Sequence, residues 1–221
     1  MAYVPNQRHV DVAFSSGRLL QKGQPVEFQC LKIGQLLVTS GALAATDPFV
    51  FPNSAPFTQR VPAGRYPVSV AIACFGTDDK RDERVAFARV ALSNLPAVSW
   101  TMALMEGQDP TTLEHDGFFG YGVDAGTGCF MDPVAGRLLA DRMDRDDDYC
   151  DVIIEEMEKT YRSTRSWHDW RPSPERNENI ICFSSGWGDG IYPSFFGLSG
   201  EDHLCTLLTD FFVLSDEEGA A

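Results

Sequence analysis

Two glycine-rich segments hold the residues whose types and spacing could do chemistry. The first, FFGYGVDAGTGCFMDP at 118–133, has five glycines within or directly before it, and two aspartates flank its tightest part. Glycine is needed where the backbone takes a positive φ or approaches another group closely. Such a loop can turn its amides and carboxylates toward a ligand. We expect four of its residues to contact that ligand: Asp124, Gly126, Gly128 and Asp132. The alternative is a closely packed strand–turn–strand.

The second segment, SSGWGDGIYP at 184–193, places one acid among three glycines. Asp189 is the acid, and Trp187 and Tyr192 are the aromatic residues beside it. An acid next to aromatic rings suits a polar ligand that also has an apolar face. We therefore expect these three residues to bind the same ligand. The alternative is a hairpin turn at Asp189-Gly190 in which Trp187 covers a sheet edge.

Carboxylates and one thiol are the candidate catalytic groups. If Asp124, Asp132 and Asp189 lie close together, one raises the pKa of another, and the pair can divide the roles of acid and base. Such an oxygen-rich site would also suit Mg²⁺, Mn²⁺ or Ca²⁺. Cys129 is the cysteine that lies inside a glycine loop, and it would need a neighbouring base to act as a nucleophile.

Known cofactor motifs do not fit these segments. The glycine spacing is not that of a dinucleotide fingerprint, and a phosphate-binding loop would need a lysine that is missing here. The spacing of an EF-hand is also missing. We expect no nucleotide cofactor; if a divalent metal binds, Asp124, Asp132 and Asp189 are its candidate ligands.

The charge of the chain is concentrated in two segments. The 221 residues carry a formal net charge of −14. Residues 141–158 hold nine acids and two arginines, and residues 201–221 hold six acids and no arginine or lysine. A nucleic-acid or anionic membrane surface needs basic patches, so neither is expected as a partner. A basic protein or a small polar ligand is expected instead.

Strand patterns dominate the elements that must position these residues. Alternating apolar residues predict an antiparallel meander, and three later runs predict further strands. The expected strands lie within 34–49 (two, with a turn at Ser40-Gly41), and at 66–74, 83–92, 97–104, 179–185, 191–196 and 203–214. Connecting loops are expected at 48–62, 78–83 and 166–178.

Helix signals are confined to the middle of the chain. Pro133 at a first turn predicts a short helix over 133–142. Apolar residues at three- and four-residue spacing predict an amphipathic helix over about 147–165, with acids before it and bases at its end. The acids of this segment thus have a structural explanation that needs no ligand.

The patterns together predict the α+β class, mostly β, with antiparallel sheets that are sandwich-like or strongly bent and one flanking amphipathic helix. The chain is 43% hydrophobic, so we expect one globular domain over 1–214 with a helical insertion at about 133–165. The acidic tail 215–221 is expected to be disordered. No signal peptide or membrane span is visible, and the six cysteines are expected to be reduced, so a cytoplasmic protein is expected.

The order of the motifs resembles a bacterial family of unknown function, the domain-of-unknown-function family numbered 4241. The resemblance covers about 34–214, and its most specific parts are VDAGTGCFMD and SGWGDGIYP. It implies that the two glycine loops are the hallmark segments of the family. It implies no activity, cofactor or catalytic role.

Two classes of function remain open. The first is a binding or regulatory protein that recognises a partner or polar ligand through the two Gly/Asp loops. The second is a carboxylate-dependent hydrolase or lyase, with or without a divalent metal. Both rest on the expectation that the loops converge at one end of the sheets.

Overall fold

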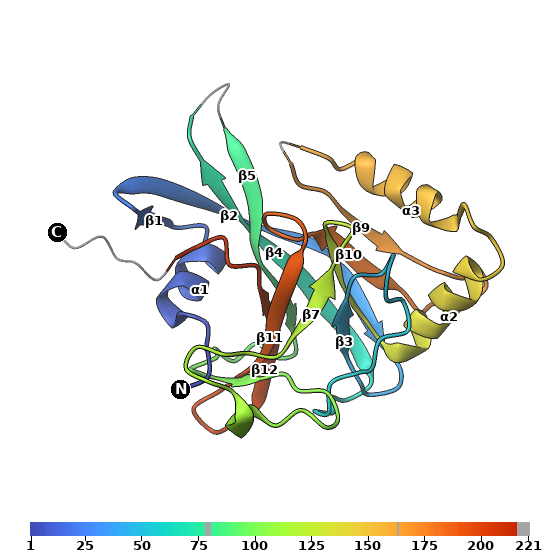
Figure 1. Cartoon of the computed structure of the whole chain (residues 1–221), viewed down its shortest axis with the longest axis horizontal. Coiled ribbons are helices and arrows are strands. Elements are labelled where there is room, and N and C mark those ends of the chain that lie inside the picture. The colour runs from blue at the N-terminus through green and yellow to red at the C-terminus, as the bar shows by residue number, and fades with distance from the viewer. Residues whose placement is uncertain (78–80, 163, 216–221) are drawn as a thin grey trace.

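Two antiparallel sheets face each other in a computed structural model that describes residues 1–77, 81–162 and 164–215 (Figure 1). The larger sheet curls into half of a barrel and follows the order β1-β2-β4-β5-β12-β11-β6, with β7 also paired to β11. Its strands are β1 (Arg18–Gln21), β2 (Gln24–Val38), β4 (Gly64–Phe75), β5 (Asp82–Ala91), β6 (Ser99–Met102), β7 (Gly120–Val123), β11 (Gly190–Leu198) and β12 (Leu204–Asp210).

The smaller sheet has the order β3-β8-β10-β9, and two helices cover its outer face. Its strands are β3 (Ala44–Thr46), β8 (Thr127–Met131), β9 (Trp167–Trp170) and β10 (Ile180–Ser184). The helices are α2 (Pro133–Met143) and α3 (Tyr149–Glu158). A third helix, α1 (Gln7–Phe14), packs on the larger sheet, and a short 3-10 turn, η2, spans Pro110–Thr112.

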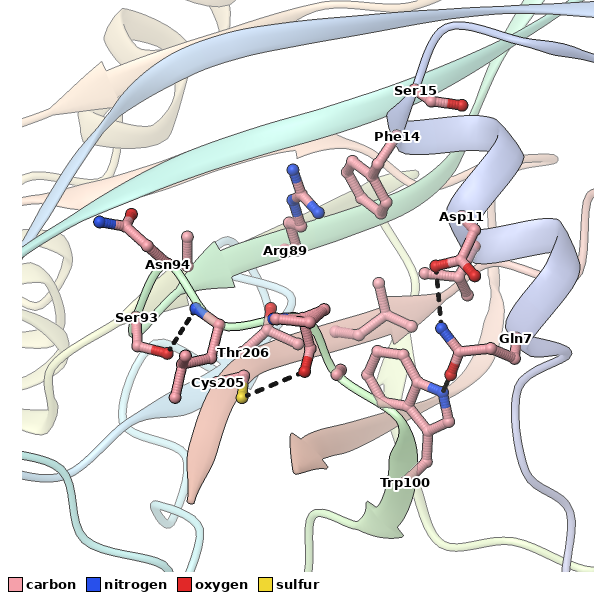
Figure 2. Close-up of a pocket in the computed structure, with 16 residues that line it drawn as sticks. Gln7, Asp11, Phe14, Ser15, Arg89, Ser93, Asn94, Trp100, Cys205 and Thr206 are labelled. Atoms are coloured by element: carbon pink, nitrogen blue, oxygen red, sulfur yellow. Dashed lines mark hydrogen bonds between the residues drawn. The ribbon is translucent and has the colours of Figure 1, made fainter. Parts of the chain in front are cut away.

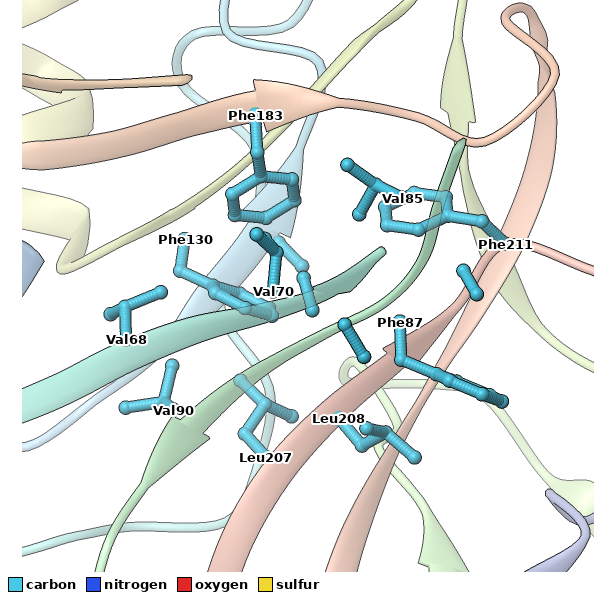
Figure 3. Packing of buried hydrophobic residues seen from close by; sticks show 14 of the residues in the cluster. Val68, Val70, Val85, Phe87, Val90, Phe130, Phe183, Leu207, Leu208 and Phe211 are labelled. Carbon is cyan, nitrogen blue, oxygen red and sulfur yellow. The ribbon is translucent and has the colours of Figure 1, made fainter. Parts of the chain in front are cut away.

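The alternation of side chains in the smaller sheet separates two cores. Phe130 and Phe183 point toward the larger sheet, with ring centroids 5.1 Å apart, and join its valines and leucines (Figure 3). Cys129 and Cys182 point the other way and pack against α2 and α3. Because both faces of β8 are covered, all five of its residues are buried.

The class predicted from the sequence is confirmed, since the fold is mostly antiparallel β with helices in addition. The described residues contain three α-helices where one flanking amphipathic helix and a short helix were expected. The short helix expected at 133–142 is confirmed as α2, with Pro133 in its first turn. No helix in the described parts of the chain is long and apolar enough to cross a membrane.

The expected three-stranded meander is wrong in its last member. β4 and β5 are antiparallel neighbours, but β12 occupies the other side of β5, and β6 pairs with β11 instead. Alternation reports which face of a strand is buried and does not report its neighbour. The hairpin loop expected at 78–83 falls partly on 78–80, which lie outside the described residues.

The expected helix over 147–165 is too long, and the loop over 166–178 is wrong at its start. α3 ends at Glu158, after which the backbones of Arg162 and Arg165 bond to each other. The chain then continues as β9, which pairs with β10. Of the tail expected to be disordered, 216–221 lie outside the described residues.

Candidate functional site

The two glycine loops lie side by side because both cross from one sheet to the other at the same place. Loop 124–126 joins β7 of the larger sheet to β8 of the smaller one, and loop 185–189 joins β10 to β11. Since β7 pairs with β11 and β8 pairs with β10, the two crossings must run together. The backbone N–H of Ser185 donates to the carbonyl of Gly126 at 3.1 Å.

Asp189 ties one loop to the other. Its carboxylate accepts a hydrogen bond from the backbone N–H of Gly126 at 3.0 Å. Tyr192 also holds loop 185–189, because its buried hydroxyl donates a hydrogen bond to the carbonyl of Gly188 at 2.9 Å. Positive φ values at Gly126 and Gly188 explain why these positions favour glycine. Asp189 and Tyr192, which were expected to bind a ligand, thus help to fix the shape of the loops.

Asp47 is a central residue of this region that sequence reasoning did not single out. Its fully buried carboxylate accepts hydrogen bonds from the backbone N–H groups of Asp124 (3.0 Å), Ala125 (2.8 Å) and Phe49 (2.9 Å). The bond to Phe49, two residues on, is the local turn that an Asp-Pro pair signals. The hydrogen bonds to loop 124–126 join residues about eighty positions apart in the sequence, so no local sequence pattern predicts them. The amides of that loop are therefore engaged within the protein.

Asp132 lies away from the other two expected carboxylates. It caps the N-terminus of α2 at the far end of β8, roughly 15 Å of strand from loop 124–126. Its buried carboxylate accepts from the backbone N–H of Val134, from the backbone N–H of Thr39, and from both the N–H and the hydroxyl of Ser40. The carboxyl groups of Asp124, Asp132 and Asp189 are not gathered at one point.

Gly128 and Cys129 lie inside β8. A Cβ on Gly128 would stand 2.9 Å from the hydroxyl of Tyr121, so the glycine permits close packing between the sheets. Burial raises the pKa of the Cys129 thiol well above its usual value. The thiolate is the nucleophilic form of cysteine, so a buried thiol that stays protonated is a poor nucleophile. Both residues have a packing role in this structure.

Asp124, Trp187 and Asp189 are the expected residues that face solvent. Trp187 is 55% exposed; its ring lies 5.9 Å from that of Phe75 and 4.8 Å from the guanidinium of Arg84. No hydrogen bond to the carboxylate of Asp124 occurs within the described parts of the chain. Its charge is available to a partner.

An apolar groove of about 220 Å³ lies between loop 124–126 and α3. We call it the acidic groove, because Glu158 lines it and exposed Asp124 directly precedes the lining residue Ala125. Its lining residues are Phe49, Ala125, Thr127, Ile154, Met157, Glu158, Tyr161 and Ser166. Ile154 and Tyr161 are 42% and 58% exposed. Glu158 stands on the α3 side, and exposed Asp124 neighbours Ala125 on the loop side.

The structure offers no assembled metal centre in the residues it describes. Across 1–77, 81–162 and 164–215, no group of three or more His, Cys, Asp or Glu side chains is placed to hold a metal ion. The site that the sequence suggested for a divalent ion would have needed Asp124, Asp132 and Asp189 together.

The fold and this region define a two-sheet antiparallel β protein whose sheets are linked by paired glycine loops beside an acidic groove. The family model described as "Protein of unknown function (DUF4241)" matches residues 36–209, and the chain belongs to this family. No curated protein and no solved structure matches the chain. The match contains both glycine loops, β3, Asp47 and α3.

Proposed function

We propose that this protein is a binding or regulatory protein that recognises a basic segment of a partner protein in the acidic groove. The observation that supports this most directly is an apolar groove with unpaired acids on its rim. Such a surface suits a segment with one apolar side chain flanked by lysines or arginines. The apolar side chain would supply the contact area, and the flanking charges would supply orientation and specificity.

The charge of α3 supports a basic partner. Asp151, Glu155 and Glu158 follow one another at helical spacing and are exposed. No ion pair to these three acids occurs in the part of the chain that the structure describes. Glu156, by contrast, pairs with Lys159. Complementary charge speeds association and selects against acidic partners.

The glycine loops have a defined place in this proposal. Loop 124–126 forms one wall of the groove, and Asp47 and Asp189 hold its backbone by three hydrogen bonds. A wall that is already fixed in the free protein loses little entropy on binding. Asp124 is then the loop residue whose carboxylate meets the partner.

We further infer that this recognition takes place in the cytoplasm. All six cysteines are free, which suits a reducing compartment. The hydrolase or lyase alternative would need two carboxylates that face one space. Asp132 accepts hydrogen bonds at a helix terminus and Asp189 accepts one between the loops, so no observation favours that alternative.

The proposal is tested by titrating the ¹⁵N-labelled protein with capped KKFKK, KKGKK and EEFEE peptides and following amide shifts. We expect KKFKK to shift amides of α3 and of loop 124–126, KKGKK to bind more weakly, and EEFEE not to bind. Neutralising Asp151, Glu155 and Glu158 (to Asn, Gln and Gln) should weaken KKFKK binding about tenfold, since each exposed pair contributes up to about 1 kcal/mol.

A matched control removes three exposed acids elsewhere: Glu106→Gln, Glu114→Gln and Glu201→Gln. The net charge of the two triple variants is equal, so a general charge effect would weaken both alike. Equal weakening, or shifts that lie outside the groove, would refute the proposal.

A further inference from the structure

A second cavity lies on the larger sheet, beneath α1. It has a volume of about 490 Å³, is open to solvent on one side and shares no lining residue with the acidic groove. α1, the end of β5, the connection from Ser93 to Ala97, Trp100 of β6 and the start of β12 surround it (Figure 2). This volume is within the range that proteins use for small-molecule ligands.

Arg89 presents an uncompensated positive charge to this cavity. Its guanidinium lies over the ring of Phe14 at 3.9 Å, and its buried Nε has no hydrogen-bond partner. No ion pair from Arg89 occurs within the described residues. Burial lowers its pKa, as expected for a cation that is partly withdrawn from water. A charge in this position is costly unless something pairs with it.

Arg84, on the same strand, shows the usual arrangement. Its guanidinium also lies over an aromatic ring, that of Trp187, but it forms an ion pair with Asp82 at 2.9 Å. The Nε of Arg84 also lacks a hydrogen bond, so the two arginines differ in the carboxylate partner and not in this atom. Phe14 covers one face of the Arg89 guanidinium, and the fork of N–H donors lies in the plane of that group, where a carboxylate binds with two parallel hydrogen bonds.

Asp11 is the other charged residue among those that line the cavity. The side-chain amide of Gln7 donates to its Oδ1 at 2.9 Å, and the indole N–H of Trp100 donates to the Gln7 carbonyl oxygen at 2.8 Å (Figure 2). These bonds orient Asp11 and leave its Oδ2 available. Asp11 and Arg89 form no ion pair with each other. The cavity thus offers one separate charge of each sign.

We propose that this cavity binds a small zwitterion of the amino-acid type, with its carboxylate on Arg89 and its ammonium group on Asp11. The apolar body of the ligand would pack against Trp100, Leu95 and Pro96, which line the same space. A purely anionic ligand fits less well, because it would meet Asp11 and a chain whose net charge is −14. A purely cationic ligand would leave Arg89 unpaired.

The test is a thermal-shift and calorimetric screen of the full chain against each common L-amino acid. Every binder is then compared with its decarboxylated amine and its deaminated acid. We expect at least one amino acid to raise the melting temperature. Each truncated analogue should bind about tenfold more weakly or worse, because each loses a charge-assisted contact. If no amino acid binds, or if both analogues bind equally well, the proposal is wrong.

Variants locate the site. Arg89→Lys keeps the charge but loses the fork, and Arg89→Gln loses the charge; both should weaken binding at least about tenfold. Asp11→Asn should remove the preference for the amino acid over its deaminated acid. The control, Arg84→Gln, breaks an ion pair outside the cavity and should leave binding unchanged. Unaltered binding in folded Arg89 variants would overturn the assignment.

Discussion

At the scale of single residues, two aspartates that look alike in the sequence have opposite roles. Asp47 is buried and accepts three backbone hydrogen bonds, two of them from the loop that carries Asp124. Asp124 is exposed, and its own N–H is one of the groups that Asp47 holds. The aspartate that shapes the groove is therefore distinct from the one that faces a partner.

This difference predicts opposite results from two substitutions. Asp47→Ala leaves three N–H groups without their acceptor, so it should lower the free energy of unfolding by about 3 kcal/mol. Asp124→Asn should leave that free energy unchanged while it weakens KKFKK binding. Urea denaturation followed by fluorescence, together with the peptide titration, checks both. A large loss of stability in Asp124→Asn would mean that its carboxylate has a structural role.

At the scale of elements, a buried ion pair fixes the segment that follows α3. The guanidinium of Arg165 binds Glu83 of β5 at 2.8 Å, and both side chains are at most one-tenth exposed. Arg81 binds the other oxygen of Glu83 at 2.8 Å. The ion pair ties the segment that follows α3 to the larger sheet. It therefore helps to fix the position of α3 beside the groove.

Glu83→Gln should therefore destabilise the protein by about 3 kcal/mol, because it leaves the buried Arg165 without its counter-charge. Glu156→Gln is the control, since it removes a glutamate whose partner, Lys159, is exposed. Differential scanning calorimetry compares the two variants. A Glu83→Gln protein as stable as the control would show that this ion pair contributes no net stability.

At the scale of the whole molecule, the net charge of −14 acts on the two proposed ligands differently. A basic peptide is attracted over a distance of several ångströms, and salt screens that attraction. A zwitterion has no net charge, so the net charge of the chain neither attracts nor repels it as a whole.

Raising the ionic strength from about 0.05 M to about 0.5 M should therefore weaken KKFKK binding several-fold. The same change should alter amino-acid binding much less. Calorimetry at both salt concentrations makes the comparison. Peptide binding that is insensitive to salt would contradict the charge-based recognition proposed for the acidic groove.

Sequence reasoning succeeded where a few neighbouring residues decide the structure. The mostly β class and the helix at 133–142 follow from periodicity and from Pro133, which are properties of short segments. The first part of β2 was missed, because the register shift between Lys32 and Gly34 interrupts its alternation. The glycines also identified both loops, since positive φ at Gly126 and Gly188 is a local requirement.

The sequence by itself determined the mostly β class, the helix at 133–142, which turns need glycine and where the acids gather along the chain. Only the tertiary structure decided that β12 separates β5 from β11, that Asp47 holds loop 124–126, and that Asp11 and Arg89 face one cavity. The physical reason is distance along the chain. Periodicity and turn chemistry act over a few residues, whereas strand neighbours and the partners of buried charges are chosen from the whole folded molecule.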